Sequence, residues 1–140
     1  MQLVSQILAA YALVILMTLV HAIGVVLVTK LLKLEDESLR AHRLDIGAFT
    51  LLISMALGLF ALHTLEIGLF ASFYLAVGAI HDLEEALYFS TSAYATLGHP
   101  DIDFPAQWRL VGAVEGLAGF LLIGWSTAVF VTDMTKLLRK

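Results

Sequence analysis

Apolar residues fall into three long runs along the chain, separated by two more polar stretches. The runs cover about residues 3–29, 45–80 and 108–133, and the first contains no charged residue. Each is longer than the roughly 20 apolar residues that a helix needs to cross a bilayer. The pattern therefore predicts three membrane-spanning helices. The first run lacks the basic leader and the small-residue cleavage site of a signal peptide, so we expect it to be retained.

The second run is predicted to form one helix rather than a hairpin of two. It contains no proline, and its glycines stand singly at Gly47, Gly58, Gly68 and Gly78. At 1.5 Å per residue it would extend for roughly 54 Å, which exceeds the hydrocarbon thickness but is too short for two spans and a loop. We expect one long helix that tilts or protrudes from the bilayer.

Composition supports this assignment and narrows the available chemistry. Sixty per cent of the 140 residues are apolar and 14% are charged, whereas soluble domains are about half apolar and about a quarter charged. The chain has no cysteine, which excludes disulfides and thiolate metal sites. Histidine, carboxylate and backbone oxygen remain as ligands. The net charge of −4 is a poor guide to partners, and we expect no nucleic-acid partner.

Basic residues determine the predicted orientation. Seven of the eight lysines and arginines fall in the first loop or at the C-terminus: Lys30, Lys33, Arg40, Arg43, Lys136, Arg139 and Lys140. By the positive-inside rule these parts are cytoplasmic, and the N-terminus and the segment before the third run face outward. We predict a multi-pass protein of the cell (inner) membrane. Its first loop is expected to contact anionic lipid, although Glu35, Asp36 and Glu37 dilute the positive field.

The segment 84–101 lies between two predicted spans but is too short, and too polar at both ends, to span the bilayer itself. Residues 83–95 predict a short helix, whose acidic start at Asp82, Glu84 and Glu85 is favoured by the helix dipole. Its carbonyl end would point into the membrane, and residues 96–101 would return outward as an extended strand. Backbone inside a membrane must be sheltered by protein or water. We therefore predict a re-entrant pore loop whose carbonyls bind dehydrated cations at a shared axis.

This arrangement resembles the pore domain of tetrameric potassium channels. The resemblance rests on a spanning helix, a short helix ending in Ala-Thr-Leu-Gly-His-Pro-Asp (95–101), and a final helix with Gly116, Gly119 and Gly124. The stretches 87–90, 108–110 and 124–127, together with Glu115, add to it. The likeness covers residues 57–131, and the chain is similar to small bacterial ion channel proteins that carry an extra N-terminal helix.

The resemblance implies an all-α integral membrane protein with three transmembrane helices, one re-entrant pore helix and a filter loop, assembled as a C4 homotetramer. Within a single membrane domain of residues 1–140, it implies an extra helix at 3–29, a cytoplasmic loop at 30–44, an outer helix at 45–80, a pore helix and filter at 83–101 and an inner helix at 105–134. Four copies can enclose a pore that one copy cannot. The implied function is passive conduction of monovalent cations, potassium first, with no cofactor and no catalysis.

The filter of that family usually has the sequence Thr-Thr-Val/Leu-Gly-Tyr-Gly-Asp, which this chain matches only in part. Thr96, Leu97, Gly98 and Asp101 match, whereas Ala95, His99 and Pro100 differ. Proline is locked at a φ near −65° where glycine reaches positive φ, and it pushes the preceding residue towards extended conformations. We expect the outer ion sites to be lost and the inner sites to persist, because Gly98 still permits the turn above them. Selectivity for potassium would then be weak or altered.

At the outer mouth, His99 and Asp101 would each form a ring of four. Carboxylate rings select for cations, and protonation of the His99 ring at mildly acidic pH is expected to suppress their entry. Other roles stay open. Asp101 alternatively bonds to Trp108, His99 alternatively faces solvent, and the acidic residues at the start of the short helix alternatively serve as caps.

Behind the loop, Glu115 lies one or two turns inside the last helix, where an ionisable group is expensive and therefore a functional candidate. By resemblance it braces the pore loop through Thr91, Ser92 or loop N–H groups. Glu115, Trp108 and Thr91 are thus the predicted filter support. Gly119 is either the hinge of a gate or a site of close helix packing.

A competing interpretation is a metal site. His63 and Glu66 stand three apart on one helix face, and with His21 and Glu115 they offer ligands suited to zinc or iron. The chain would then be a membrane-embedded metal enzyme or carrier. The plainer interpretation is a hydrogen bond between His63 and Glu66 or a polar contact with the first helix. A third possibility, a channel-like scaffold that does not conduct, follows from Pro100.

Overall fold

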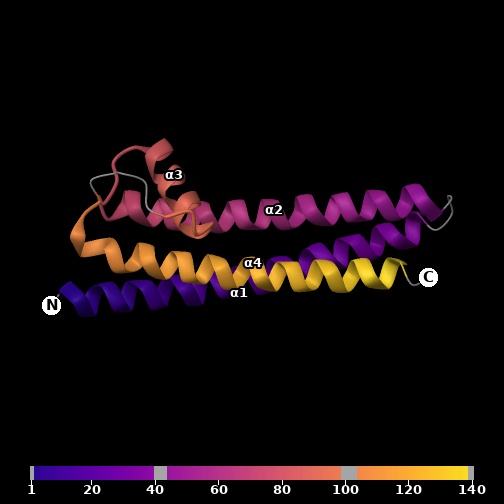
Figure 1. The fold of residues 1–140 in the computed structure, drawn as a ribbon, viewed down its shortest axis with the longest axis horizontal. Coiled ribbons are helices and arrows are strands. Elements are labelled where there is room, and N and C mark those ends of the chain that lie inside the picture. The colour runs from indigo at the N-terminus through magenta and orange to yellow at the C-terminus, as the bar shows by residue number, and fades with distance from the viewer. Residues whose placement is uncertain (1, 40–43, 99–103, 139–140) are drawn as a thin grey trace.

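The computed structural model describes residues 2–39, 44–98 and 104–138, which are helical apart from short connections (Figure 1). The elements follow the order α1 (Gln2–Leu39), α2 (Leu44–Ala76), α3 (Leu83–Tyr94), a 3₁₀ turn η1 (Ala106–Trp108) and α4 (Arg109–Leu138). No strand occurs in these ranges, which confirms the all-α class.

Within the described ranges, three helices are long and apolar enough to cross a membrane. The qualifying stretches are Leu3–Leu31 in α1, Phe49–Ala76 in α2, and Ala106–Thr135 in η1 and α4. Two helix lengths differ from expectation: α1 continues to Leu39 through much of the stretch predicted as a loop at 30–44, and α2 ends at Ala76 rather than at residue 80. The leucines, lysines and glutamates of the α1 extension are good helix formers, so the helix continues after its apolar run ends.

The three long helices lie side by side, and α2 runs opposite to α1 and α4 (Figure 1). The N-terminus lies at the same end of the bundle as α3 and the start of α4. The ends of α1 and α4 and the start of α2 lie at the opposite end. Helix α3 packs against both α2 and α4. The two segments that the charge pattern assigns to one side of the membrane are therefore at one end of the bundle.

Aromatic side chains hold α3 in its position. Phe89 of α3 stacks on Phe104, with ring centroids 4.2 Å apart. Tyr74 of α2 meets both rings edge-on, at 5.2 and 5.4 Å. All three side chains are buried, and edge-to-face contacts of this kind add about 0.5–1.5 kcal/mol each to the burial of apolar area. This cluster fixes the middle of α3 against the bundle.

The start of α3 is capped as well as packed. The Asp82 side chain accepts a hydrogen bond from the backbone N–H of Glu85 at 3.1 Å, and Glu84 and Glu85 occupy the first turn. Capping satisfies one of the free N–H groups of the helix start, and negative charge is favourable there. Capping is thus the role that the structure gives to Asp82.

Candidate functional site

The C-terminal end of α3 is closed by a Schellman motif. The Leu97 N–H donates to the Ser92 carbonyl at 2.9 Å, and the Thr96 N–H donates to the Ala93 carbonyl at 3.0 Å. Thr96 is left-handed, with a φ of +58°, as this motif requires of the first residue beyond the helix. The chain therefore leaves α3 in a tight turn, and the extended strand expected from residue 96 onward does not begin there.

The turn has an unusual backbone for its sequence. A β-branched residue such as Thr96 rarely adopts positive φ, and conformations of this kind cost about 1–3 kcal/mol and cluster at functional sites. Gly98 also has a positive φ, +99°, as expected for a glycine that permits a turn. Between them, the Leu97 side chain is 80% exposed. Three of the predicted filter residues therefore form an exposed turn at the end of α3.

The other predicted filter residues, His99 and Asp101, lie outside the described residues, as does Pro100. The proposed rings at the outer mouth and the effect of Pro100 on the filter remain predictions.

Behind α3, the Glu115 carboxylate is fully buried between three helices. Tyr74 of α2 donates to Oε2 at 2.6 Å, and the Ser90 hydroxyl of α3 donates to Oε1. Ser90 Oγ also lies 2.9 Å from the Ile67 carbonyl oxygen. Glu115 thus connects α4 to α2 and to α3.

The contact between Glu115 and α3 differs in detail from the expected one. Ser90, rather than Thr91 or Ser92, bonds to the carboxylate. Thr91 is exposed, and its hydroxyl donates to the Leu87 carbonyl at 2.7 Å within α3, because one residue along a helix turns the side chain by about 100°. Thr91 therefore makes no bond to Glu115.

Trp108, predicted to support the filter, packs edge-on against Phe73 of α2 with ring centroids 5.3 Å apart. Its indole N–H is buried and has no hydrogen-bond partner among the described residues. Asp101, its predicted partner, is not one of them.

A second buried carboxylate, Glu66 of α2, forms hydrogen bonds with side chains from α1, α2 and α3. His21 Nδ1 lies 2.8 Å from Oε1, His63 Nδ1 lies 3.1 Å from Oε2, and the Tyr94 hydroxyl donates to Oε2 at 2.5 Å. Glu66 and His21 are 0% exposed, and His63 is 17% exposed. The structure thus brings together three of the four predicted metal ligands. The fourth, Glu115, is bonded to Tyr74 and Ser90 instead.

The Tyr94 hydroxyl is held in its protonated form. Burial raises the pKa of Tyr94 above its usual value, and the hydrogen bond to the Glu66 carboxylate raises it further. The hydroxyl therefore donates to Glu66, and this bond ties the last residue of α3 to α2.

Gly119 of α4 lies directly against the backbone of α3. A Cβ atom at position 119 would stand 2.3 Å from the Tyr94 carbonyl oxygen, and one at Gly116 would stand 3.0 Å from that of Ala93. Of the two roles predicted for Gly119, close packing has this geometric basis. Helix α4 is continuous through the position, and the hinge role stays a prediction.

These contacts place the end of α3 halfway along its neighbours. His63 lies at the middle of the candidate span Phe49–Ala76, and Gly119 lies near the middle of Ala106–Thr135. Tyr94 contacts both residues. Helix α3 therefore finishes at the mid-level of the spans.

Three residues that complete these clusters were missed in the sequence, namely Tyr74, Ser90 and Tyr94. A signal for two of them was present. Ser90 and Tyr94 are four apart in a short helix and so share a face, and buried carboxylates such as Glu66 and Glu115 require donors. The two hydroxyls on one face of the short helix could therefore have been predicted as the hydrogen-bond donors to the two buried carboxylates.

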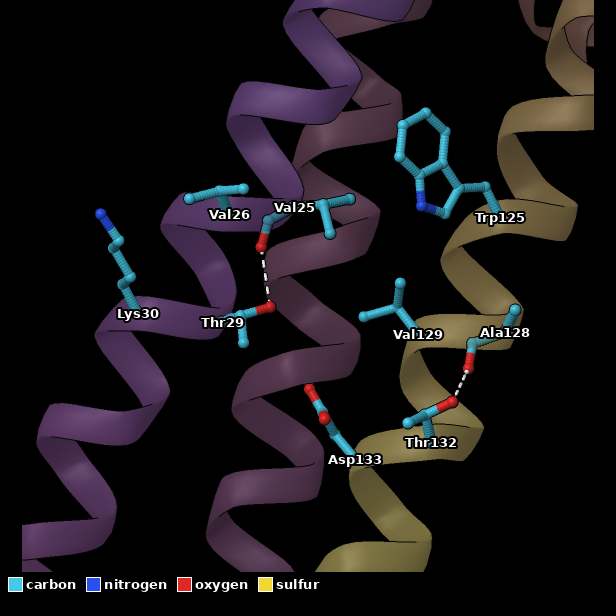
Figure 2. Close-up of a pocket in the computed structure, with 9 residues that line it drawn as sticks. All are labelled: Val25, Val26, Thr29, Lys30, Trp125, Ala128, Val129, Thr132 and Asp133. Carbon is cyan, nitrogen blue, oxygen red and sulfur yellow. Dashed lines mark hydrogen bonds between the residues drawn. The ribbon is translucent and has the colours of Figure 1, made fainter.

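A cavity of about 550 Å³ lies between α1 and α4, in the half of the bundle away from α3 (Figure 2). Its lining consists of Val25, Val26, Thr29, Lys30, Trp125, Ala128, Val129, Thr132 and Asp133. Trp125 stands at one end and Asp133 at the other, with Lys30 at the α1 side. The Trp125 ring also packs on His21, with centroids 5.1 Å apart, so one side chain separates the cavity from the Glu66 cluster.

Together, the fold and these clusters define an all-α membrane protein in which the end of a short helix is held among three apolar spans. Residues 52–136 match the ion channel family, the two-transmembrane potassium-channel pore family, and the chain belongs to it. This confirms the resemblance and supports an ion channel function. The match covers α3, η1 and most of α2 and α4, whereas α1 lies outside it. No curated protein and no solved structure matches the chain.

Proposed function

We propose that the chain is the subunit of a cation channel in which four copies surround one axis and α3 is the re-entrant pore helix. The observation that carries this proposal is the level of Tyr94. Its hydroxyl bonds to side chains at the middle of the α2 span, and its backbone lies against Gly119 near the middle of the α4 span. A helix that ends halfway through a bilayer needs protein or water around its end. A wet axis shared by four copies supplies both.

The electrostatics of the helix end suit a cation. The C-terminus of a helix carries about half a negative charge, and four such ends would stabilise a cation at the membrane centre. Leu97 and Gly98, directly beyond this end, are exposed in the single chain. In the tetramer, neighbouring copies would cover the Leu97 side chain, and the carbonyl groups of residues 96–98 would replace water around the ion.

Potassium is our first candidate ion, with weak selectivity over sodium. The inner filter positions Thr96, Leu97 and Gly98 agree with the family pattern, whereas His99 and Pro100 replace its Tyr and Gly. Conduction would be passive, without cofactor or catalysis. We place the homotetramer in the cell membrane, with the N-terminus outside and the C-terminus in the cytoplasm.

Support for the filter is assigned to Glu115 and Trp108. Glu115 bonds to Ser90 on the back of α3 and would resist tilting of that helix. The buried indole N–H of Trp108 favours a bond to Asp101, because an unpaired buried donor costs about 1–3 kcal/mol. Gly119 remains the proposed hinge of the gate on the inner side.

Ion flux tests this function. The full chain is reconstituted into liposomes, and potassium and sodium uptake are measured separately. We expect both ions to pass. The double variant H99Y/P100G restores the family pattern and should raise the potassium-to-sodium permeability ratio about tenfold, equivalent to about 1.4 kcal/mol of discrimination.

The matched control is Leu8→Ala, a change on an exposed face of α1, which should leave flux unchanged. Silence of both the wild type and the double variant, with the tetramer intact, would overturn conduction and favour a scaffold.

A further inference from the structure

Three potential metal ligands converge inside the bundle from two helices that are distant in sequence. One ligand atom each from His21 of α1 and from His63 and Glu66 of α2 lies within 4.8 Å of the others. The two pairs that involve Glu66 are much closer, at 2.8 Å to His21 Nδ1 and 3.1 Å to His63 Nδ1. A buried set of two imidazoles and one carboxylate is a typical protein site for a borderline transition metal.

The separations fit the size of such an ion. Bonds of about 2.0–2.2 Å from zinc to nitrogen and oxygen place the ligand atoms of a tetrahedral ion about 3.3 Å apart. The two pairs use different oxygens of Glu66, Oε1 for His21 and Oε2 for His63, and each separation is already close to this value. A small rotation of the carboxylate or of one imidazole would bring both nitrogens around one ion. Calcium and magnesium prefer sets of oxygen ligands, which two imidazoles and one carboxylate do not provide.

We propose that His21, His63 and Glu66 bind one divalent transition-metal ion of the zinc class, joining α1 to α2 beside the end of α3. This site is independent of the proposed channel function, because it is assembled within one chain and requires no conduction. It would fix the N-terminal helix to the part of the bundle that holds Tyr94.

The surrounding contacts prepare the histidines for this role. In the hydrogen-bonded cluster, Nδ1 of each imidazole carries the proton, because carboxylate oxygens only accept. On metal binding this proton moves to Nε2, and Nδ1 presents its lone pair to the ion. Ser126 Oγ lies 3.4 Å from His21 Nε2, where it would accept the new N–H bond, as outer-shell partners of metal-bound histidines do. The partial exposure of His63 leaves one side of the cluster open for a fourth ligand.

The cavity between α1 and α4 offers a route to the site. Figure 2 shows Trp125 at one end of this cavity, Asp133 at the other and Lys30 at the α1 side. A carboxylate at the entrance attracts a cation, and Lys30 partly offsets this attraction. The Trp125 ring separates the cavity from His21, so an ion would enter when the indole turns aside.

Metal titration of the purified full chain in detergent micelles, after treatment with a chelator, tests the site. Cobalt(II) serves as a spectroscopic probe, because a tetrahedral site with nitrogen and oxygen ligands gives it strong visible absorption. Zinc is then measured by displacement of the cobalt. We expect one ion per chain, and zinc should raise the unfolding temperature of the wild type.

Two variants and a matched control assign the ion to this cluster. Glu66→Gln keeps the shape of the carboxylate but removes its charge, and His21→Asn removes one imidazole. Each should weaken binding at least about tenfold and abolish the cobalt band. His81→Ala changes an exposed histidine between α2 and α3 and should leave binding unchanged.

Binding that survives both buried substitutions, or that His81→Ala removes, would place the ion on the surface and overturn the proposal. Absence of stoichiometric binding would also overturn it and leave the cluster as a hydrogen-bond network. If either buried variant fails to fold by circular dichroism and gel filtration, Ser126→Ala replaces it and should weaken binding several-fold. Loss of flux in liposomes would count against the channel function and not against this site.

Discussion

Two buried carboxylates, Glu66 and Glu115, are each bonded to a tyrosine from another helix. Tyr94 of α3 donates to Glu66 of α2, and Tyr74 of α2 donates to Glu115 of α4. A buried carboxylate without donors would be strongly unfavourable in a bilayer. Each pair therefore satisfies the charge and also fixes the distance between two helices. At the scale of single residues, the Tyr94–Glu66 bond holds α3 against α2, and the Tyr74–Glu115 bond holds α2 against α4.

Replacement of Tyr74 by phenylalanine removes one donor to Glu115 and leaves the ring in place. Because the carboxylate stays buried with one donor fewer, we expect the free energy of unfolding to fall by about 1–2 kcal/mol. Unfolding in mixed micelles, followed by tryptophan fluorescence, measures the change. Tyr11→Phe, on an exposed face of α1, is the matched control and should change the free energy by less than about 0.5 kcal/mol. Equal effects of the two substitutions would contradict the role of Tyr74.

The sequence identified the carboxylates but not their partners. The burial of Glu115 could be predicted from its position in an apolar run, because an ionisable side chain inside a membrane faces the protein interior and needs a hydrogen-bond partner there. Which of Ser90, Thr91 and Ser92 faces it depends on the rotation of α3, which is determined by the packing of Phe89 on Phe104. The sequence of this twelve-residue helix does not indicate its rotation, because residues 90–92 all carry hydroxyl groups.

At the scale of elements, the end of α3 is held from two sides. The Tyr94 side chain bonds to α2, and the Tyr94 backbone touches α4 where Gly119 has no side chain. Small residues allow membrane helices to approach closely. The left-handed Thr96 then ends the helix at this level, so both the packing and the backbone determine where the chain turns.

Gly119→Ala should displace the end of α3. Its Cβ atom would lie 2.3 Å from the Tyr94 carbonyl oxygen and 2.9 Å from Tyr94 Cα, and this is backbone that cannot rotate away. We expect a loss of about 1–3 kcal/mol in the free energy of unfolding, despite a gain of up to about 1 kcal/mol in helix propensity.

Gly124→Ala is the matched control in the same helix, since a Cβ atom there meets nothing within 4 Å. It should be neutral or slightly stabilising in the same unfolding measurement. Equal losses for both substitutions would show that helix α4 is sensitive to alanine in general and not to contact with Tyr94.

Most of the helices could be predicted from apolar runs and caps. Helix α3 was expected at 83–95 and occupies Leu83–Tyr94, because acidic residues mark its start and Gly98-His99-Pro100 prevents it from continuing. The turn at Thr96 was not predictable, since threonine disfavours positive φ. It adopts this conformation in the folded chain, where the N–H groups of Thr96 and Leu97 bond to the Ala93 and Ser92 carbonyls.

At the scale of the whole molecule, the single chain leaves many large apolar side chains exposed on its long helices. Lipid covers such surfaces without cost. Contact with lipid is unfavourable for the exposed backbone at Gly98, because its polar groups would lack hydrogen-bond partners. The exposed turn at the end of α3 is therefore the part of the chain that the proposed symmetric assembly would cover.

A single engineered cysteine tests this assembly, because the natural chain contains none. In the proposed tetramer, Leu97→Cys lies near the axis, so a short bifunctional maleimide should join neighbouring copies into covalent dimers in native membranes. Leu8→Cys, exposed on α1, should remain monomeric under the same treatment. Native mass spectrometry should give about 61 kDa, four times the 15.3-kDa chain. A mass of one chain, or equal cross-linking at both positions, would contradict a fourfold axis beside α3, because chance collisions in the membrane would join the two cysteines alike.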